Sequence, residues 1–111
     1  MRRLIRFRAI DRHIFEDIKK RKKTVETRAA SERYQKIKVG DVLIFRCGSD
    51  SFEKKVRKVT HFKSAEALFK KHSFKDVRPD LTTKAEAIKA YGSFPGYIEK
   101  IRKFGIVAFE L

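Results

Sequence analysis

The sequence predicts an α+β fold built as a small β-barrel with flanking helices, and three observations support this prediction. Segments 5–9 and 106–111 alternate apolar and polar residues, as half-buried strands do. Between them, segments with helically spaced apolar residues alternate with short runs rich in β-branched residues. Short turns separate most of these segments, which indicates about five or six strands joined mainly as hairpins.

In the first half we expect a strand at 5–9, a helix at 11–20, a strand at 24–28, a helical turn at 31–35 and a strand at 42–45. Asp11 is predicted to cap the helix, in which Ile14, Phe15 and Ile18 recur at helical spacing. Val42 to Phe45 is an uninterrupted apolar run, which is typical of a strand buried on both faces.

In the second half we expect a hairpin loop at 48–51, a strand with a bulge at 52–62, helices at 64–72, 83–91 and 98–104, and a last strand at 106–111. Ser64 is predicted to cap the first of these helices, and Thr83 with Glu86 has capping-box spacing at the second. Residues 74–80 are predicted to be irregular because Pro79 interrupts them.

Net charge is the strongest feature of the composition. The chain has 29 Lys plus Arg against 14 Asp plus Glu, a formal net charge of +15. Such a field attracts polyanions and makes their binding strongly salt-dependent. Thermophile proteins rich in lysine usually balance it with glutamate, so an unbalanced excess favours nucleic-acid contact. We therefore expect RNA, or a nucleotide or nucleoside, as the partner.

The 111 residues are predicted to form one domain, 1–111, which is long enough to bury a core. A single cysteine, Cys47, excludes an internal disulfide and favours a reducing cytoplasm. No apolar run is long enough to span a membrane. The histidines at 13, 61 and 72 share no metal-ligand spacing. We expect no membrane, metal or cofactor, and we favour a monomer.

The stretch KKRKKTVETR, residues 19–28, carries the candidate chemistry. Its basic run consists of Lys19, Lys20, Arg21, Lys22 and Lys23. One or two cations at the C-terminal end of a helix interact favourably with the helix dipole, but five in succession are more than this stabilisation requires. The strand that follows carries one acid, Glu26, and one further base, Arg28. A carboxylate among so many cations is either an ion-pair partner or the working group of an anion-binding site.

Three segments, KKTVETR, KVGDVLIF and the terminal FPGY…GIVAFEL, together resemble the activating signal cointegrator homology (ASCH) domain. That family is similar in fold to the PUA RNA-binding domains, so the resemblance implies a small PUA-like β-barrel with flanking helices. The resemblance covers nearly the whole chain and implies a link to RNA binding and RNA processing. It also implies a cleft between barrel and helices, lined by Lys23 and Glu26 with Arg28 nearby.

A small bacterial branch of that family hydrolyses the acetyl amide of acetylated cytidine with a lysine, a threonine and a more distant glutamate. Lys23 matches the lysine, but Glu26 occupies the threonine position, so the hydroxyl nucleophile is absent. The third residue would fall among the acids of segment 75–86, where the candidates are Asp76, Asp80 and Glu86. This departure from the pattern favours binding over that hydrolysis.

Glu26 admits three roles. As a general base toward water it would need a raised pKa, with Lys23 stabilising developing negative charge. As an ionised acceptor it would bind a base edge, such as the cytosine amine, while cations hold phosphate. Nearby cations lower a carboxylate pKa, which favours this second role. The third role is an ion pair with Lys23 or Arg28 that only orders the strand. Strict alternation separates Lys23 from Glu26 unless Lys23 lies in a turn.

Our leading hypothesis is an RNA-binding domain in which residues 19–28 and Arg33 contact phosphate and Glu26 recognises a base. Tyr34, in a polar loop, is the preferred residue for stacking on a base, whereas Phe94 and Tyr97 are expected to fill the core. The alternative is a hydrolase of RNA or a modified nucleoside with Lys23 and Glu26 as catalytic residues. A third hypothesis is a basic module that binds an acidic protein.

Overall fold

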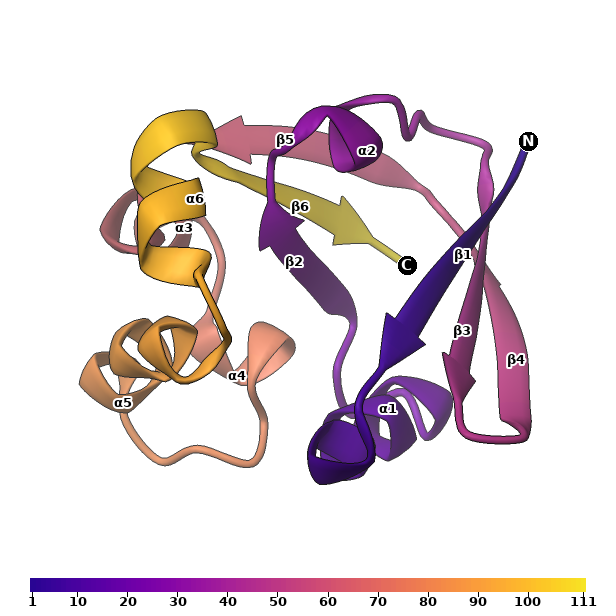
Figure 1. The fold of residues 1–111 in the computed structure, drawn as a ribbon. Helices are drawn as coiled ribbons and strands as arrows, with labels where there is room; N and C mark the ends of the chain where they lie inside the picture. Colours follow the sequence, from indigo (N-terminus) through magenta and orange to yellow (C-terminus); the bar gives the residue numbers. More distant parts are fainter.

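The α+β class is confirmed by a computed structural model that describes all residues, 1–111 (Figure 1). The strands are β1 (Arg2–Phe7), β2 (Val25–Ala29), β3 (Val42–Cys47), β4 (Asp50–Lys55), β5 (Lys58–Phe62) and β6 (Ile106–Glu110). The α-helices are α1 (Arg12–Lys19), α2 (Glu32–Gln35), α3 (Ala65–Lys71), α4 (Phe74–Val77), α5 (Lys84–Ala90) and α6 (Tyr97–Phe104). Two 3-10 turns, η1 (Ala9–Asp11) and η2 (Tyr91–Ser93), complete the order.

The strands form two three-stranded sheets, β1-β3-β4 and β2-β6-β5. Strand β1 pairs with β3 in parallel, and the other pairs are antiparallel. The chain passes from one sheet to the other at Val56 and Arg57, whose N–H groups donate to the carbonyls of Asp41 and Glu110 at 2.8 and 2.7 Å. Strands β1 and β4 are the edges of the first sheet, β2 and β5 are the edges of the second, and no edge strand of one sheet pairs with an edge strand of the other. The expected closed barrel is therefore not confirmed.

The expected single strand at 52–62 is wrong, because the chain changes from one sheet to the other within this segment. Val56 is fully buried between the sheets and breaks the segment into β4 and β5, which pair with different partners. What the sequence suggested as a bulge is the corner at which the chain changes sheet.

Two apolar clusters hold the structure together, and β6 lies between them. The first joins both sheets to α1 and includes Phe15, Phe45 and Phe109. The second lies between the β2-β6-β5 sheet and the helices beside it in Figure 1, and includes Leu68 and Ile106. Successive β6 residues alternate between the two clusters, so this strand is buried on both faces.

The expectation that 42–45 is buried on both faces is wrong. Leu43, Phe45 and Cys47 point into the core, whereas Val42 and Ile44 remain partly exposed. The reason is that α1 covers only one face of the β1-β3-β4 sheet, and no element covers the other face (Figure 1).

The helices of the second half agree largely with the sequence. Ser64 accepts a hydrogen bond from the N–H of Ala67, and Thr83 accepts one from the N–H of Glu86, so both predicted caps are confirmed. Segment 74–80 is not wholly irregular, because α4 forms one helical turn before Pro79. None of the helices has the length and apolar character that a transmembrane span requires.

Helix α1 ends inside the basic run through backbone hydrogen bonds. The N–H groups of Lys22 and Lys23 both donate to the carbonyl of Asp17, at 2.9 and 3.0 Å, and Arg21 adopts a left-handed φ of 65°. Lys23 therefore lies in the turn before β2. Because it is not part of the strand, the alternation of side chains between the two strand faces does not separate it from Glu26.

Candidate functional site

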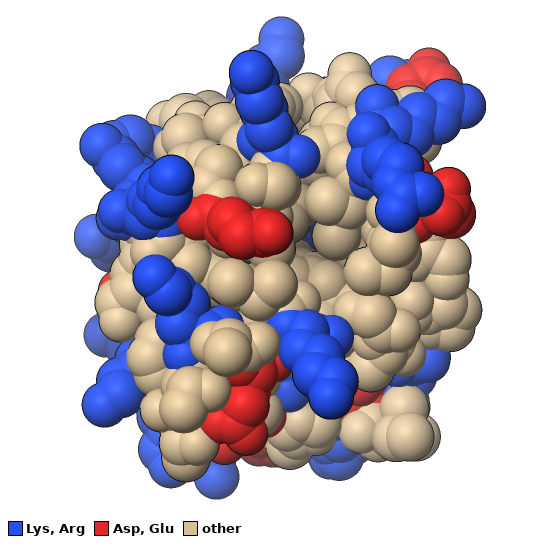
Figure 2. All heavy atoms as spheres, turned by 90° about the vertical axis from the view of Figure 1, so that its left-hand side faces the viewer, with Lys and Arg blue, Asp and Glu red and all other residues tan.

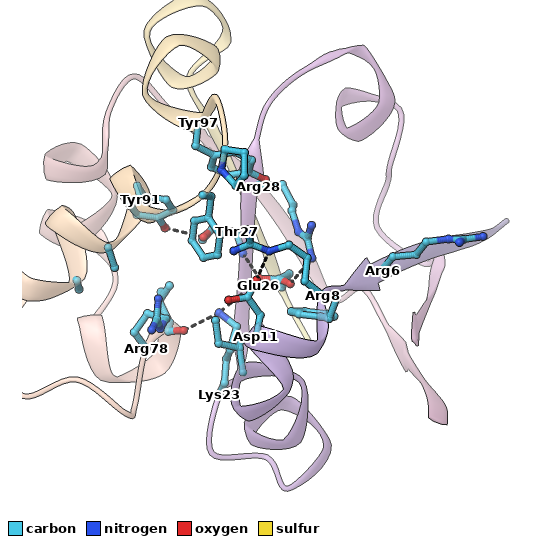
Figure 3. A pocket seen from close by; sticks show the side chains of 17 residues that line it. Arg6, Arg8, Asp11, Lys23, Glu26, Thr27, Arg28, Arg78, Tyr91 and Tyr97 are labelled. Carbon is cyan, nitrogen blue, oxygen red and sulfur yellow. Dashed lines mark hydrogen bonds and ion pairs between the residues drawn. The ribbon is translucent and has the colours of Figure 1, made fainter. Parts of the chain in front are cut away.

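A pocket of about 200 Å³ opens where β1 and β2 face each other without pairing (Figure 3). Segments from β1, β2, α4, α5 and α6 contribute to its wall. The lining residues with polar or charged side chains are Arg6, Arg8, Asp11, Lys23, Glu26, Thr27, Arg28, Arg78, Tyr91 and Tyr97. The pocket thus lies at the open seam of the fold and combines arginines, acids and aromatic rings.

Glu26 lies between Lys23 and Arg28 in the wall of this pocket. Its Oε1 is 3.4 Å from Lys23 Nζ and accepts a hydrogen bond of 2.9 Å from the N–H of Thr27. Its Oε2 accepts from Arg28 at 3.3 Å. The Lys23 and Glu26 side chains are only 3% and 4% exposed, so the sequence-predicted trio meets as a buried charge cluster. Lys23 also donates to the carbonyls of Val25 and Val77 at 2.8 and 2.5 Å.

The cluster keeps Glu26 ionised. Burial alone would raise the pKa of Glu26, but the charges of Lys23 and Arg28 and the Thr27 N–H hold it below the ordinary value of 4.5. Burial lowers the pKa of Lys23, and the charge of Glu26 opposes that shift. Burial also opposes the charge of Arg28, yet Glu26 raises the pKa of this guanidinium. An ionised, hydrogen-bonded Glu26 is an acceptor in this pocket.

This lowered pKa predicts a contribution to acid sensitivity. Folded Glu26 binds a proton less readily than unfolded Glu26, so its stabilisation is present above the unfolded pKa and is lost as pH falls through the folded pKa. We expect the free energy of unfolding to fall more steeply below pH 4.5 in the wild type than in Glu26→Gln. Urea unfolding at several pH values measures this difference. Parallel profiles would contradict the assignment.

Arg28 is held rigidly but keeps free donors. Its guanidinium carbon lies 5.0 Å from the Phe7 ring centroid and 5.7 Å from that of Tyr34, within cation–π range of both. Its side chain is 16% exposed, and its one hydrogen bond goes to Glu26. A guanidinium has five N–H donors, so several remain available to a ligand in the pocket.

The pocket also has an aromatic wall. Phe94 and Tyr97 are half-buried, with ring centroids 5.4 Å apart, and both line the pocket. The Arg8 guanidinium lies 5.7 Å from the Phe94 centroid. Deeper in the pocket, the hydroxyls of Thr27 and Tyr91 share a hydrogen bond of 2.5 Å, and burial raises the pKa of Tyr91. Phe94 and Tyr97 thus border the pocket rather than only filling the core.

The other predicted binding residues lie outside this pocket. Residues 19–22 are exposed and do not line it. Arg33 donates to the carbonyl of Leu4 at 3.0 Å on the edge of β1. Tyr34 packs between the guanidinium groups of Arg33 and Arg28, with its ring 5.6 and 5.7 Å from them. Tyr34 therefore supports Arg28 from outside the pocket.

None of the three candidate acids of segment 75–86 lines the pocket. Asp80 accepts two hydrogen bonds from Arg78, and Glu86 accepts hydrogen bonds from the threonines before α5. Asp76 is exposed. The second acid that does line the pocket is Asp11. Its expected capping role is wrong, because its carboxylate makes no cap hydrogen bond and instead accepts from Arg8 Nε at 2.7 Å.

Sequence reasoning also missed the arginines of the pocket rim, Arg6, Arg8 and Arg78. A signal for two of them was present, since Arg6 and Arg8 alternate with apolar residues at the end of the first strand. Nothing local marks Arg78, because α4 brings it to the pocket from a distant part of the chain. No group of three or more His, Cys, Asp or Glu side chains is placed to hold a metal ion.

Basic side chains are also spread widely outside the pocket. On the face of the molecule beside α3, α5 and α6, Lys and Arg side chains are scattered among uncharged residues, with acidic side chains between some of them (Figure 2). Net charge alone therefore does not locate a binding site. The pocket is distinguished by its buried charge cluster and aromatic wall.

Comparison with known proteins identifies relatives of this chain. The model of the ASCH domain family matches residues 9–111. The chain is similar to the crystal structure of hypothetical protein PH0355, with 30% identity, a TM-score of 0.84, and coverage of 99% of this chain and 96% of that one. It is also similar to the solution NMR structure of protein PF0455 from Pyrococcus furiosus, with 30% identity, a TM-score of 0.76, and coverage of 99% and 94%. No curated protein matches the chain.

Proposed function

The chain belongs to the ASCH domain family, and from this premise we propose that it binds single-stranded RNA by taking one nucleobase into the β1–β2 pocket. The observation that carries the proposal is the meeting of an ionised, buried Glu26, the free donors of Arg28 and an aromatic wall in one cavity. Single-stranded RNA is recognised by stacking of unstacked bases and by hydrogen bonds to their edges, which need these groups.

The size of the pocket limits what it can hold. Its volume of about 200 Å³ is below the roughly 300–1,000 Å³ of sites for drug-sized ligands, which suits one small ring system. A nucleic-acid duplex would have to flip a base out of its stack to place it there, at a cost of a few kcal/mol, whereas a single strand pays less. The net charge of +15 supports the proposal by drawing the strand to the surface, and the exposed residues 19–22 add to that attraction.

The charge state of Glu26 sets the expected base preference. An ionised carboxylate only accepts hydrogen bonds, so it favours a base edge with an exocyclic amine. Cytosine presents such a donor, whereas uracil presents a carbonyl at the same position. We expect cytosine-containing oligomers to bind more tightly than uracil-containing ones, with Arg28 donating to an acceptor of the same base.

Phe94→Ala tests the pocket directly. Stacking on an aromatic side chain contributes about 1–3 kcal/mol per base, so this variant is expected to lose that much binding free energy for short single-stranded RNA. Fluorescence anisotropy with a labelled oligomer, repeated over a salt series, measures it. Phe104→Ala is the matched control, because Phe104 is a 40% exposed phenylalanine outside the pocket.

Three results would count against the proposal. These are an absence of RNA binding at low salt, an affinity that does not change with salt, and equal losses in Phe94→Ala and Phe104→Ala. Circular dichroism of both variants checks that the fold is retained.

The hydrolase alternative has weaker support in the geometry. Lys23 Nζ faces two carbonyls and Glu26, so the amine is occupied by structural hydrogen bonds. A general base works best with a pKa near the operating pH, whereas the pKa of Glu26 is lowered. Incubating the binding mixtures with RNA and with acetylated cytidine, then looking for products by chromatography, tests this alternative on the same samples.

A further inference from the structure

The uncovered face of the β1-β3-β4 sheet carries a pair of arginines beside the pocket. Arg6 on β1 and Arg46 on β3 are directly paired in register, and both are exposed. Neighbouring strands lie about 4.8 Å apart, so the two guanidinium groups extend from adjacent positions on one face. Arg6 also lines the pocket, and in Figure 3 its side chain points away from the pocket centre.

Neither arginine makes a side-chain hydrogen bond or ion pair, although acids are close by in sequence and register. The nearby carboxylates are all engaged elsewhere, in the pairs Arg2–Glu53, Arg12–Asp50 and Arg8–Asp11. Like charges placed opposite each other on neighbouring strands destabilise a sheet. Two adjacent arginines without an acid therefore cost stability in the free protein, and an anion bound between them would remove that cost.

In the next row of the same face, β1 and β3 carry apolar residues, and β4 carries Glu53, which pairs with Arg2. Leu4 and Ile44 are paired in register one row away from the two arginines and are half-buried. A phosphate held by the arginines would thus have two apolar side chains beside it on β1 and β3, against which a sugar or base can pack. Bidentate contacts make arginine well suited to a phosphate group.

We propose that Arg6 and Arg46 bind a backbone phosphate of the RNA strand whose base occupies the pocket, so that the strand leaves the pocket across the β1-β3-β4 face. This inference rests on the proposed function for the identity of the strand. It adds a phosphate site and a direction for the strand, because Arg6 belongs to both the pocket rim and the sheet face.

The double variant Arg6→Gln/Arg46→Gln tests the site. Each phosphate contact to a single strand contributes about 0.7 to the slope of log affinity against log salt. Because both arginines hold one phosphate, the double variant is expected to lose about 0.7 in slope and roughly tenfold in affinity at low salt. The control Lys70→Gln/Lys71→Gln removes the same charge from exposed positions on α3, which packs against the other sheet. Short single-stranded RNA and a duplex of the same sequence are the probes.

The outcomes separate this site from the pocket. A loss in the arginine variant that exceeds the loss in the lysine control, for single strands, supports the site. Equal losses in both variants, or equally tight binding of the duplex, overturn it. If Phe94→Ala weakens binding and the arginine variant does not, the pocket stands and the phosphate site fails. If the arginine variant alone weakens binding, the phosphate site stands and the base pocket fails.

Discussion

Glu26→Leu is expected to lower the free energy of unfolding by about 3–5 kcal/mol, because removing one member of a buried ion cluster leaves its partners uncompensated. Lys23 is 3% exposed and Arg28 is 16% exposed, so water cannot fully replace the lost carboxylate. The N–H of Thr27 loses its acceptor as well. Urea denaturation followed by circular dichroism measures the change.

Two further variants show how much of the loss in Glu26→Leu comes from removing the buried charge. Glu26→Gln keeps a carbonyl acceptor for the Thr27 N–H and should lose less than Glu26→Leu. Glu32→Gln alters a carboxylate that is 88% exposed and only 3.6 Å from Lys36, and exposed pairs of this kind contribute little. A loss below about 1 kcal/mol in Glu26→Leu would show that Lys23 and Arg28 do not depend on this charge.

Gly105→Ala is the second substitution with a large expected effect. Gly105 has φ 78° and ψ −165°, a region that is essentially restricted to glycine. An added Cβ would lie 2.5 Å from the backbone carbonyl oxygen of Phe62, which the adjacent β5–β6 pairing holds in place. Strain and overlap together are expected to cost about 3–5 kcal/mol.

Gly48→Ala is the control for this prediction. Gly48 also has a positive φ, of 60°, but a Cβ there would meet nothing within 4 Å. It should therefore show only the backbone strain of about 1–2 kcal/mol. Thermal or urea unfolding of the two variants gives the comparison, and equal losses would mean that the contact with Phe62 is relieved by a shift of the backbone.

The sequence predicts the elements of this fold where the pattern is local. Ser64 and Thr83 mark their helices because a cap needs only residues a few positions apart. It fails at Val56, where one extended segment divides between two sheets, since that division depends on Asp41 and Glu110 far along the chain. Hairpin connections suggest a barrel, but a closed barrel also requires the edge strands of the two sheets to pair with each other, and no such pair is present.

In the candidate site too, the sequence identifies residues that are close along the chain and misses those that only tertiary packing brings together. Lys23, Glu26 and Arg28 could be named together because six positions contain them all. Asp11 and Arg78 could not, because tertiary packing alone brings them to the pocket. Tyr34 looked available for a base from its polar surroundings, but packing against Arg28 uses its ring.

The unpaired edge of β1 bears on how the molecule behaves at high concentration. An edge strand offers free backbone groups to a second copy of the same strand, which is a common route to aggregation. Four arginines, at positions 2, 3, 6 and 8, lie on or next to β1, and Arg33 occupies one of its carbonyls. Two such strands brought together would confront like charges along their length. The arginines of this strand thus oppose edge-to-edge pairing between two copies of the chain.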